Sequence, residues 1–417
     1  MKGEKMNKEI LKRRISLLVA IVIMATTIFI PSSVRASATT SNKIKLYNFI
    51  KLTVEATGLE VETTYLNAAL KAGIVKEGDF SDYSKYTTRT DAAVILNRAD
   101  EYLHGDKVDP DLLSVVLSSR ISDISKITKD KREAVAKIYA KGFVKGYSNG
   151  HYIKSREYRG SEYMTTAGAK NVISMLKDTK KRAKLSPDGQ LIRTTNLPKN
   201  AKDYEYILET YPNSFYEMKF LYQLNKYYFD PEELIHYASP VRFKNISFHG
   251  GDMMKVLDLY KDTWMERVET NLNSRLNVDY RTIDNEWINT LRGTYVQHGV
   301  TYNDKEITDE IKDYVKVVKK NKLVIQSKVI AVEPSTLYKD MSYYVRAYVK
   351  FKVTYSGSKL TAEDLISGDY IYMPGLRKDE WFEGVYDIRL GTINGSSDGS
   401  DYYITNDSLN DYFYKGK

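Results

Sequence analysis

One arginine stands where a helix is predicted to begin, within residues 87–98. The hydroxyl of Thr88 can cap that helix, and the carboxylate of Asp91, three residues later, can reach back to the cap. Arg89 then lies in the first turn, where the helix dipole opposes a positive charge, so helix stability gives no reason for it. Arg89 is therefore a candidate for a functional residue. The ordinary alternative is a solvated arginine.

Other residues that could do chemistry are sparse. The chain has no cysteine, which excludes disulfides and thiolate metal sites, and its five histidines show no metal-ligand spacing. Asp279, Asp284 and Glu286 are close in sequence, as paired carboxylates of a hydrolase can be. Arg281 stands among them, however, and carboxylates in such clusters are usually solvated or ion-paired. The sequence therefore predicts no catalytic residue, no metal site and no cofactor, and it leaves open whether the chain is an enzyme.

The helix that carries Arg89 belongs to a scheme that occurs twice. In the first unit, residues 39–104, apolar spacing predicts helices over 42–57 and 65–72 before it, each ended by a glycine. The helix of Arg89 itself has its alanines and leucine on one face and is expected to end near Leu103.

The second unit, residues 105–184, repeats this order. It is expected to contain a helix over 131–140 and a glycine-rich turn over 141–152. A second helix then begins with a threonine pair at 165. Aligning residues 68–75 with 137–144 brings the helix, the glycine and the apolar pair after it into register. The two units therefore form an internal repeat with a period of roughly 60–80 residues.

These two units resemble S-layer homology domains. The turn of the second unit reads Gly-Phe-Val-Lys-Gly-Tyr-Ser-Asn-Gly-His-Tyr over 142–152, and the helix of the first unit opens with Thr-Arg-Thr-Asp over 88–91. Both patterns are similar to those of the family, and the resemblance spans residues 44–178. It implies non-covalent binding to a secondary cell-wall polysaccharide, often pyruvylated, in Gram-positive bacteria, with the arginine facing the acidic sugar. The glycan-binding residues that it implies are Arg89, Thr88, Asp91, Gly146 and Tyr147.

The chain departs from the family pattern in two ways. The second unit has neither arginine nor acid in its helix opening, residues 165–168, and its nearest cations, Arg156 and Arg159, precede that opening in a loop. Such modules usually act as a set of three, whereas only two full units are visible. The helix over 44–57 is either the remnant of another unit or simple packing. If the protein binds the wall, Arg89 must carry most of the binding; otherwise the repeats are a structural platform.

The N-terminal residues 1–38 are predicted to be a secretory signal. A basic start, a 16-residue apolar run over 15–30 and Ala-Ser-Ala at 36–38 are its three parts. An uncleaved anchor is the alternative, and no second apolar run of spanning length follows. The signal holds seven basic and two acidic residues, so the formal charge of +9 falls to about +4 after cleavage. Export and this modest charge argue against nucleic acid and agree with an anionic wall polymer as partner. The oligomeric state stays open.

The C-terminal half is predicted to be an α+β domain, residues 203–417, after a linker over 185–202. The expected helices are 201–228, 253–276, about 287–291 and 304–320, and the expected strands are 323–333, 342–355, 369–373, 381–393 and 401–405. Helices packed on a curved antiparallel sheet resemble nuclear transport factor-like or cystatin-like domains, by analogy only. On the longest strand, the face of Val349 is assigned to the core and the face of Arg346 to solvent.

The sequence thus predicts a multidomain, exported, wall-associated protein, with mainly α-helical repeats followed by an α+β binding or structural domain. The alternative is a wall-targeted polysaccharide or peptidoglycan hydrolase whose active site lies in the C-terminal domain. A third possibility is a secreted interaction protein whose repeats no longer bind glycan. The 35 tyrosines agree with half-buried surfaces and carbohydrate contact, or reflect a composition bias.

Overall fold

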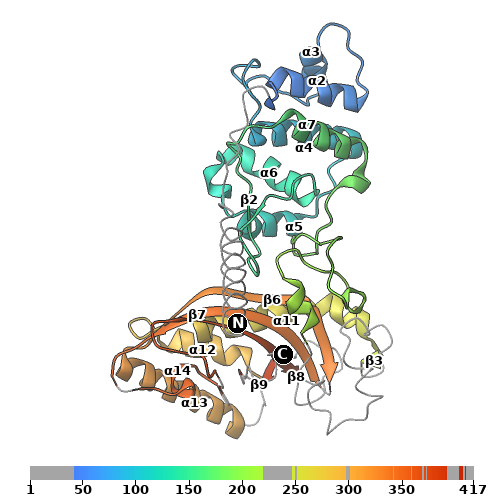
Figure 1. Cartoon of the computed structure of the whole chain (residues 1–417). Coiled ribbons are helices and arrows are strands. Elements are labelled where there is room, and N and C mark those ends of the chain that lie inside the picture. Colours follow the sequence, from blue (N-terminus) through green and yellow to red (C-terminus); the bar gives the residue numbers. More distant parts are fainter. Residues whose placement is uncertain are drawn as a thin grey trace, which may run out of the picture.

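The computed structural model describes residues 42–218, 247–248, 251–296, 301–340, 342–357, 359–368, 371, 373–391, 403–406 and 409. The predicted signal, residues 1–38, lies outside the described residues. The helices of the N-terminal half form a column above a curved sheet to which the C-terminal half contributes the strands (Figure 1). Helices come first and antiparallel strands last, so the predicted mixture of α and β structure is confirmed.

The N-terminal helices match the predicted scheme. They are α2 (Leu46–Thr57), α3 (Tyr65–Lys71), α4 (Arg89–His104), α5 (Pro110–Val115), α6 (Lys129–Ala140) and α7 (Thr166–Lys177). Gly58 and Gly73 follow α2 and α3 with φ of 72° and 70°, which are left-handed values that favour glycine and end a helix. In the second unit, β1 (Tyr147–Ser148) pairs antiparallel with β2 (Arg156–Glu157). One apolar cluster, from Ile44 to Leu176, packs these helices together.

Three helix starts meet in a ring of backbone hydrogen bonds. The N–H of Ile44 donates to the carbonyl of Met164 (3.1 Å), that of Met164 to Thr87 (2.8 Å) and that of Thr87 to Ile44 (2.9 Å). Each residue stands two positions before the first residue of α2, α7 or α4. The three segments therefore hold equivalent places, and α2 fills the place of a third helix. This favours the alternative that residues 44–57 are the remnant of another unit.

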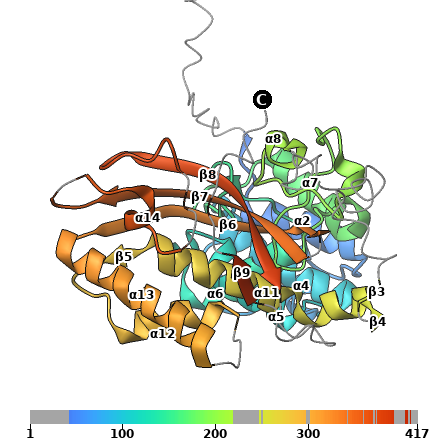
Figure 2. The same cartoon turned by 90° about the horizontal axis from the view of Figure 1, so that it is seen from below.

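The C-terminal sheet is a meander in the order β5-β6-β7-β8-β9, with every neighbouring pair antiparallel. Its strands are β5 (Val278–Asp279), β6 (Val324–Asp340), β7 (Ser342–Thr354), β8 (Trp381–Gly391) and β9 (Tyr403–Asn406). The helices are α11 (Met253–Leu276), α12 (Asn285–Thr294), α13 (Thr301–Asn321) and the short α14 (Ala362–Leu365). A two-stranded hairpin, β3 (Ser247–Phe248) with β4 (Gly251–Asp252), precedes α11. Figure 2 shows α11, α12 and α13 lying across one face of the sheet.

The predicted core face of β7 is confirmed. Val345, Ala347, Val349, Phe351 and Val353 are fully buried in the cluster that joins the sheet to its helices. The other face was expected to be solvated, and this is wrong for its central part. Arg346 is fully buried and pairs with Asp387 of β8 (2.9 Å), because residues 204–216 cover the sheet there.

Two predicted elements differ from the structure. The expected helix over 201–228 is, within the described residues, a 3₁₀ turn (Ala201–Asp203), an irregular stretch and the short helix α8 (Asn213–Glu217) that follows Pro212. Of the expected strand over 369–373, the described residues Ile371 and Met373 belong to no strand. The tyrosines between 204 and 216 pack on the sheet, so their apolar spacing reflects burial rather than helical periodicity.

The segment expected to be a linker folds back on itself. Bridges join Leu185 to Leu191 and Ile192 to Leu208, and the N–H of Arg193 donates to the carbonyl of Ile207 (2.7 Å). The domain boundaries themselves stay a prediction.

Candidate functional site

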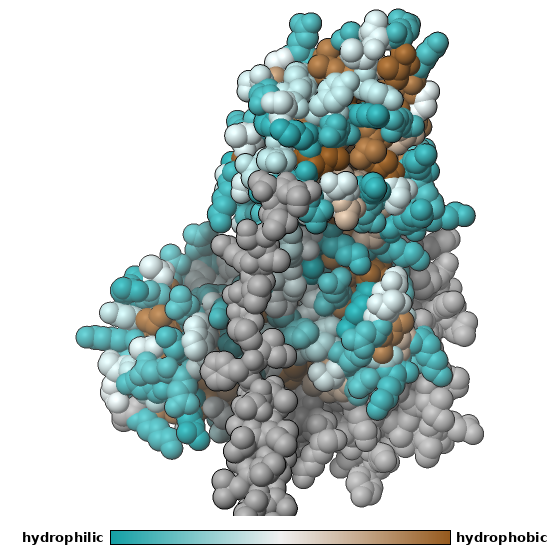
Figure 3. Space-filling model, turned by 45° about the horizontal axis from the view of Figure 1, so that its top comes forward, coloured by the Kyte–Doolittle hydropathy of each residue, from teal (hydrophilic) through white to brown (hydrophobic). Residues whose placement is uncertain are grey.

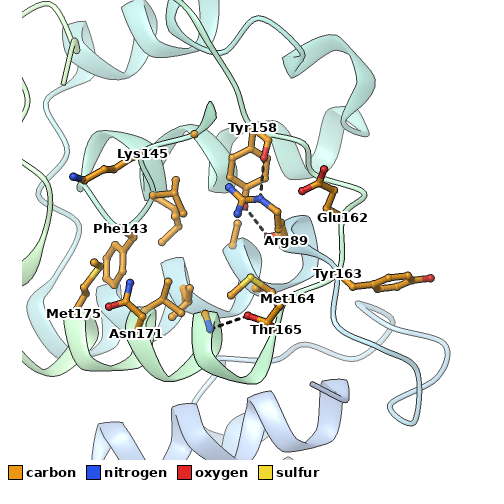
Figure 4. A pocket seen from close by; sticks show the side chains of 18 of the residues that line it. Arg89, Phe143, Lys145, Tyr158, Glu162, Tyr163, Met164, Thr165, Asn171 and Met175 are labelled. Atoms are coloured by element: carbon orange, nitrogen blue, oxygen red, sulfur yellow. Dashed lines mark hydrogen bonds between the residues drawn. The ribbon is translucent and has the colours of Figure 1, made fainter. Parts of the chain in front are cut away.

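Arg89 lies at one end of a groove of about 380 Å³ in the N-terminal part. The walls are the start of α4, the turn after α6 and the start of α7, so both repeat units contribute. Figure 4 shows Arg89 and Tyr158 at one end of the groove and Phe143, Asn171 and Met175 at the other. The charged residues of the lining are Arg89, Lys145 and Glu162, which leave a net positive charge.

Two neighbours on the loop before α7 hold Arg89 in place. Its backbone N–H donates to the carbonyl of Glu162 (2.8 Å), and its Nε donates to the carbonyl of Tyr158 (2.9 Å). The hydroxyl of Tyr158 donates in return to the carbonyl of Arg89 (2.7 Å), and burial raises the pKa of that hydroxyl, so it stays a donor. Among the described residues, the two terminal guanidinium nitrogens of Arg89 have no hydrogen-bond or ion-pair partner. They remain able to bind an anion.

Gly146 and Tyr147, which the resemblance implies to be glycan-binding residues, also line this groove. The guanidinium carbon of Arg89 is 5.3 Å from the centre of the Tyr147 ring, and that of Arg159 is 3.9 Å away. Both are within the range of a cation–π contact. Gly146 has φ of 63°, and a Cβ there would meet the carbonyl oxygen of Glu157 at 2.9 Å. Only glycine fits this turn without displacement of the backbone, and the turn presents Tyr147 to the arginines.

Thr88 and Asp91 stand beside the groove rather than in it. Both line a neighbouring polar hollow of about 530 Å³. The hydroxyl of Thr88 accepts the N–H of Asp91 (3.0 Å), so the predicted helix cap is confirmed. The carboxylate of Asp91 reaches back to Thr88, as expected, and its oxygens also lie 3.1 Å from Nζ of Lys85 and 3.2 Å from Nζ of Lys131.

The ion pairs of Asp91 keep this buried acid charged. Burial alone would raise its pKa, but hydrogen bonds and charge attraction from Lys85 and Lys131 outweigh burial, and the pKa lies below its usual value. Because two lysines face one carboxylate, the negative charge next to Arg89 is compensated. Asp91 therefore supports the start of α4 and leaves the neighbouring guanidinium available for a ligand.

Sequence reasoning missed Tyr158, Glu162, Asn171 and Gly168, which also line the groove. Gly168 stands two residues after the first residue of α7, as Asp91 does in α4, so it takes the place of the acid that the second unit lacks. A carboxylate there would add a negative charge to the lining. The glycine at this position, where the family pattern has an acid, could therefore have indicated an anion-binding groove, because it leaves this position without a negative charge that would repel an anion.

Most of the remaining lining is apolar, with Tyr163 and Thr165 as the exceptions. Ala92, Ala93, Leu96, Ile138, Phe143, Val144, Met164, Val172 and Met175 form its floor. A cation at one end of an apolar floor fits a small ligand that carries an acid group next to a methyl or acetyl group. On the face shown in Figure 3, the N-terminal part is mainly hydrophilic, with several smaller hydrophobic groups among the hydrophilic residues.

The candidate carboxylates of the C-terminal half have local structural roles. Asp279 pairs with Arg281, and Asp284 caps α12 by accepting the N–H groups of Glu286 and Trp287, each at 3.0 Å. The side chain of Glu286 is exposed. None of the three lines either hollow described above. In the part of the chain that the structure describes, no helix combines the length and the apolar character needed to cross a membrane.

Comparison with known proteins identifies one family. Residues 120–152 match the model of the S-layer homology domain, and this stretch contains α6, Gly146 and Tyr147 but not Arg89. No curated protein and no solved structure matches the chain. The chain therefore carries an S-layer homology domain, as its resemblance predicts. Domains of this family mediate attachment to the cell wall through its polysaccharides, which associates the protein with the cell surface.

Proposed function

We propose that this S-layer homology domain protein is exported and attaches to an anionic secondary polysaccharide of the cell wall through the groove of Arg89. The observation that carries the proposal is the position of Arg89, at the end of a groove built by both repeat units, with its terminal nitrogens turned to no described partner. A planar guanidinium can donate a hydrogen bond to each of the two oxygens of a sugar carboxylate at once.

The shape of the groove supports a pyruvylated sugar. A pyruvate ketal carries a carboxylate and a methyl group on the same carbon, and the lining offers Arg89 for the first and an apolar floor for the second. The ring of Tyr147 is 37% exposed at the rim and can pack against the face of a sugar. These two contacts together would distinguish an acidic sugar with a methyl group from a neutral one.

One groove carries the binding in this proposal. The residues equivalent to Arg89 at the ring of helix starts are Leu46 in α2 and Thr166 in α7. Leu46 is fully buried and Thr166 has no charge, so neither can pair with an acidic sugar. The C-terminal half then serves as a further binding or structural part of the surface protein. The alternative of a wall-targeted hydrolase would need a cleft with paired carboxylates.

Sedimentation with purified wall sacculi tests the proposal. The chain without its predicted signal should sediment with sacculi that retain their secondary polysaccharide and stay in solution with sacculi stripped of it. Arg89→Ala should lower the affinity at least tenfold, since a hydrogen-bonded charge pair contributes about 1.5–3 kcal/mol. Arg281→Ala is the matched control, because it removes an exposed arginine that pairs only with Asp279 two residues away.

The outcomes separate the function from the site. Equal sedimentation with complete and stripped sacculi would refute attachment through the secondary polysaccharide. Binding that depends on the polysaccharide but is equal in Arg89→Ala and Arg281→Ala would leave the function and refute the groove as its site.

A further inference from the structure

An exposed tryptophan stands on the end of the sheet that the N-terminal part leaves uncovered. Trp381, at the start of β8, is 45% exposed, whereas Trp264 is fully buried and Trp287 is partly buried against Tyr314. In Figure 1 the sheet extends past the column of N-terminal helices on the side where β6 and β8 begin. An indole that is 45% exposed on a strand can offer its free face to a ligand.

Lysines from the two neighbouring strands surround this indole. The strand register pairs Trp381 with Lys352 of β7, whose Nζ lies 5.4 Å from the centre of the ring. Nζ of Lys328, from β6, lies 6.0 Å from the same point. Neither lysine forms an ion pair with a described residue. Lys350, the next residue on this face, pairs with Glu383.

We propose that this Trp381 face, made of Trp381, Lys328, Lys350 and Lys352, is a second binding surface for an anionic polysaccharide. The indole packs against the flat side of a sugar ring, and the two lysines without a carboxylate partner bind acid groups on the neighbouring sugars. Three lysines against Glu383 alone give the face a net positive charge. The ligand, a wall polymer, is taken from the proposed function, whereas the site is separate from the groove of Arg89.

The same face continues into the contact with the second repeat. Tyr348, two residues before Lys350, stacks on Tyr152 with ring centres 3.6 Å apart, and its hydroxyl donates to Glu383 (2.8 Å). Lys154 pairs with Glu269 of α11, which joins the same two parts of the molecule. A polymer held by one site is therefore kept near the other, and a second contact raises the overall affinity without a new groove.

A polysaccharide fits this face better than a membrane surface does. Membrane binding needs several apolar side chains that enter the lipid together. The other large apolar side chains exposed among the described residues are Tyr47, Val61, Tyr102, Tyr147, Tyr163 and Leu197. The first five belong to the two repeat units and Leu197 to the predicted linker, so none is on the five-stranded sheet. One aromatic ring between lysines on a sheet matches the flat face and the acid groups of a sugar polymer.

Tryptophan fluorescence gives a direct readout, because the groove of Arg89 contains no tryptophan. The full mature chain is titrated with the anionic polysaccharide released from walls of the source organism, and quenching by acrylamide is measured. We expect the polymer to protect Trp381 and to lower the quenching constant at least twofold. Neutral dextran should give no protection. In Trp381→Phe, which keeps only the two shielded indoles, the polymer should change nothing.

A charge variant and an Arg89 variant complete the test. The double variant Lys328→Gln/Lys352→Gln should lose the protection, while Lys305→Gln/Lys316→Gln, which changes two exposed lysines of α13, should keep it. In Arg89→Ala the protection should persist at higher polymer concentration. Polymer binding that leaves Trp381 fully accessible would overturn the second surface and leave the groove intact. Protection by phosphatidylglycerol vesicles but not by the polymer would overturn it in favour of a lipid partner.

Discussion

Arg89 is held by backbone carbonyls and not by a salt bridge. The backbone carbonyls of Tyr158 and Glu162 accept its Nε–H and its backbone N–H. Of the two nearby carboxylates, that of Asp91 pairs with two lysines and that of Glu162 accepts the hydroxyl of Tyr147. An arginine built only for packing would bury its charge against an acid. Here the fold orients the guanidinium and keeps its charge uncompensated, which is the arrangement expected of an anion-binding residue.

A second residue, Glu333 of β6, makes the stability of the fold depend on pH. It is fully buried, its carboxylate accepts the N–H of Ser335 (2.9 Å), and its other oxygen lies 3.1 Å from the hydroxyl of Tyr216. Burial raises the pKa of Glu333 to about 7 from 4.5, since these hydrogen bonds offset only part of the lost hydration. At pH values between about 4.5 and about 7, Glu333 is therefore protonated in the folded chain and ionised in the unfolded chain.

Stability should therefore fall as the pH rises from about 4.5 to about 7, by roughly 3 kcal/mol from this group. Glu333→Gln removes the ionisation and keeps a side chain of similar shape with hydrogen-bonding atoms. We expect the variant to unfold at higher urea concentration than the wild type at pH 8 and at a similar concentration at pH 4.5. The exposed Glu286→Gln is the control. A wild type and a Glu333→Gln variant with the same pH profile would contradict this assignment.

At the scale of elements, the two repeat units use the same turn with different neighbours. Gly73 and Gly142 follow α3 and α6 with φ of 70° and 73°. A Cβ at Gly73 would meet nothing within 4 Å, whereas one at Gly142 would lie 2.2 Å from the carbonyl oxygen of Ala183. Both glycines adopt a left-handed conformation that other residues disfavour. Gly142 also leaves room for the backbone of Ala183, which follows α7 and lies against it.

This pair gives a matched test of the turn. Gly73→Ala should lower the free energy of unfolding by about 1 kcal/mol, which is the strain of an alanine in the left-handed conformation. Gly142→Ala should cost at least 2 kcal/mol more, because the backbone at Ala183 must move as well. Urea unfolding of the two variants measures the difference. Equal losses would mean that the second turn relaxes freely and that the approach of Ala183 is unimportant.

The elements show what the sequence could and could not predict. The N-terminal helix ends were predictable because threonine caps and glycine stops are local signals, as at Thr88 and Gly58. The burial of Arg346 was not, because its cover comes from residues 204–216, more than a hundred positions away. The groove was predictable only in part. Arg89, Gly146 and Tyr147 lie in recognisable motifs, whereas Tyr158 enters through a loop with no pattern.

At the scale of the molecule, tyrosines join the two halves. One apolar cluster lies within the N-terminal helices, another joins the sheet to α11–α13, and a third lies between them. This third cluster contains Tyr204, Tyr211, Phe215, Tyr216, Ala331 and Tyr348, with Tyr152 packed against it. Part of the high tyrosine content thus has a structural use at this junction, where most of these rings are buried. It also places the groove and the Trp381 face on parts of the chain that touch.

Tyr152 is the residue through which this coupling can be tested. Its ring contacts Tyr348, Tyr211 and Phe215, with centres 3.6, 5.6 and 5.8 Å away. Tyr152→Ala keeps the positive φ of 63° that tyrosine already tolerates, so the change removes the ring contacts alone. We expect the free energy of unfolding to fall by about 2–3 kcal/mol, because three aromatic contacts are lost.

Calorimetry should show that loss as a change in cooperativity. If the tyrosine cluster couples the halves, the wild type unfolds in one transition, and Tyr152→Ala separates a lower one for the N-terminal repeats from a higher one for the sheet. Tyr102→Ala, at a 51% exposed position of α4, should leave one transition. If this junction holds the Trp381 face and the groove at a fixed separation, Tyr152→Ala should also weaken binding to the polymer while leaving protection of Trp381 at saturation unchanged. A single transition in Tyr152→Ala, at the temperature of Tyr102→Ala, would show that the junction does not couple them.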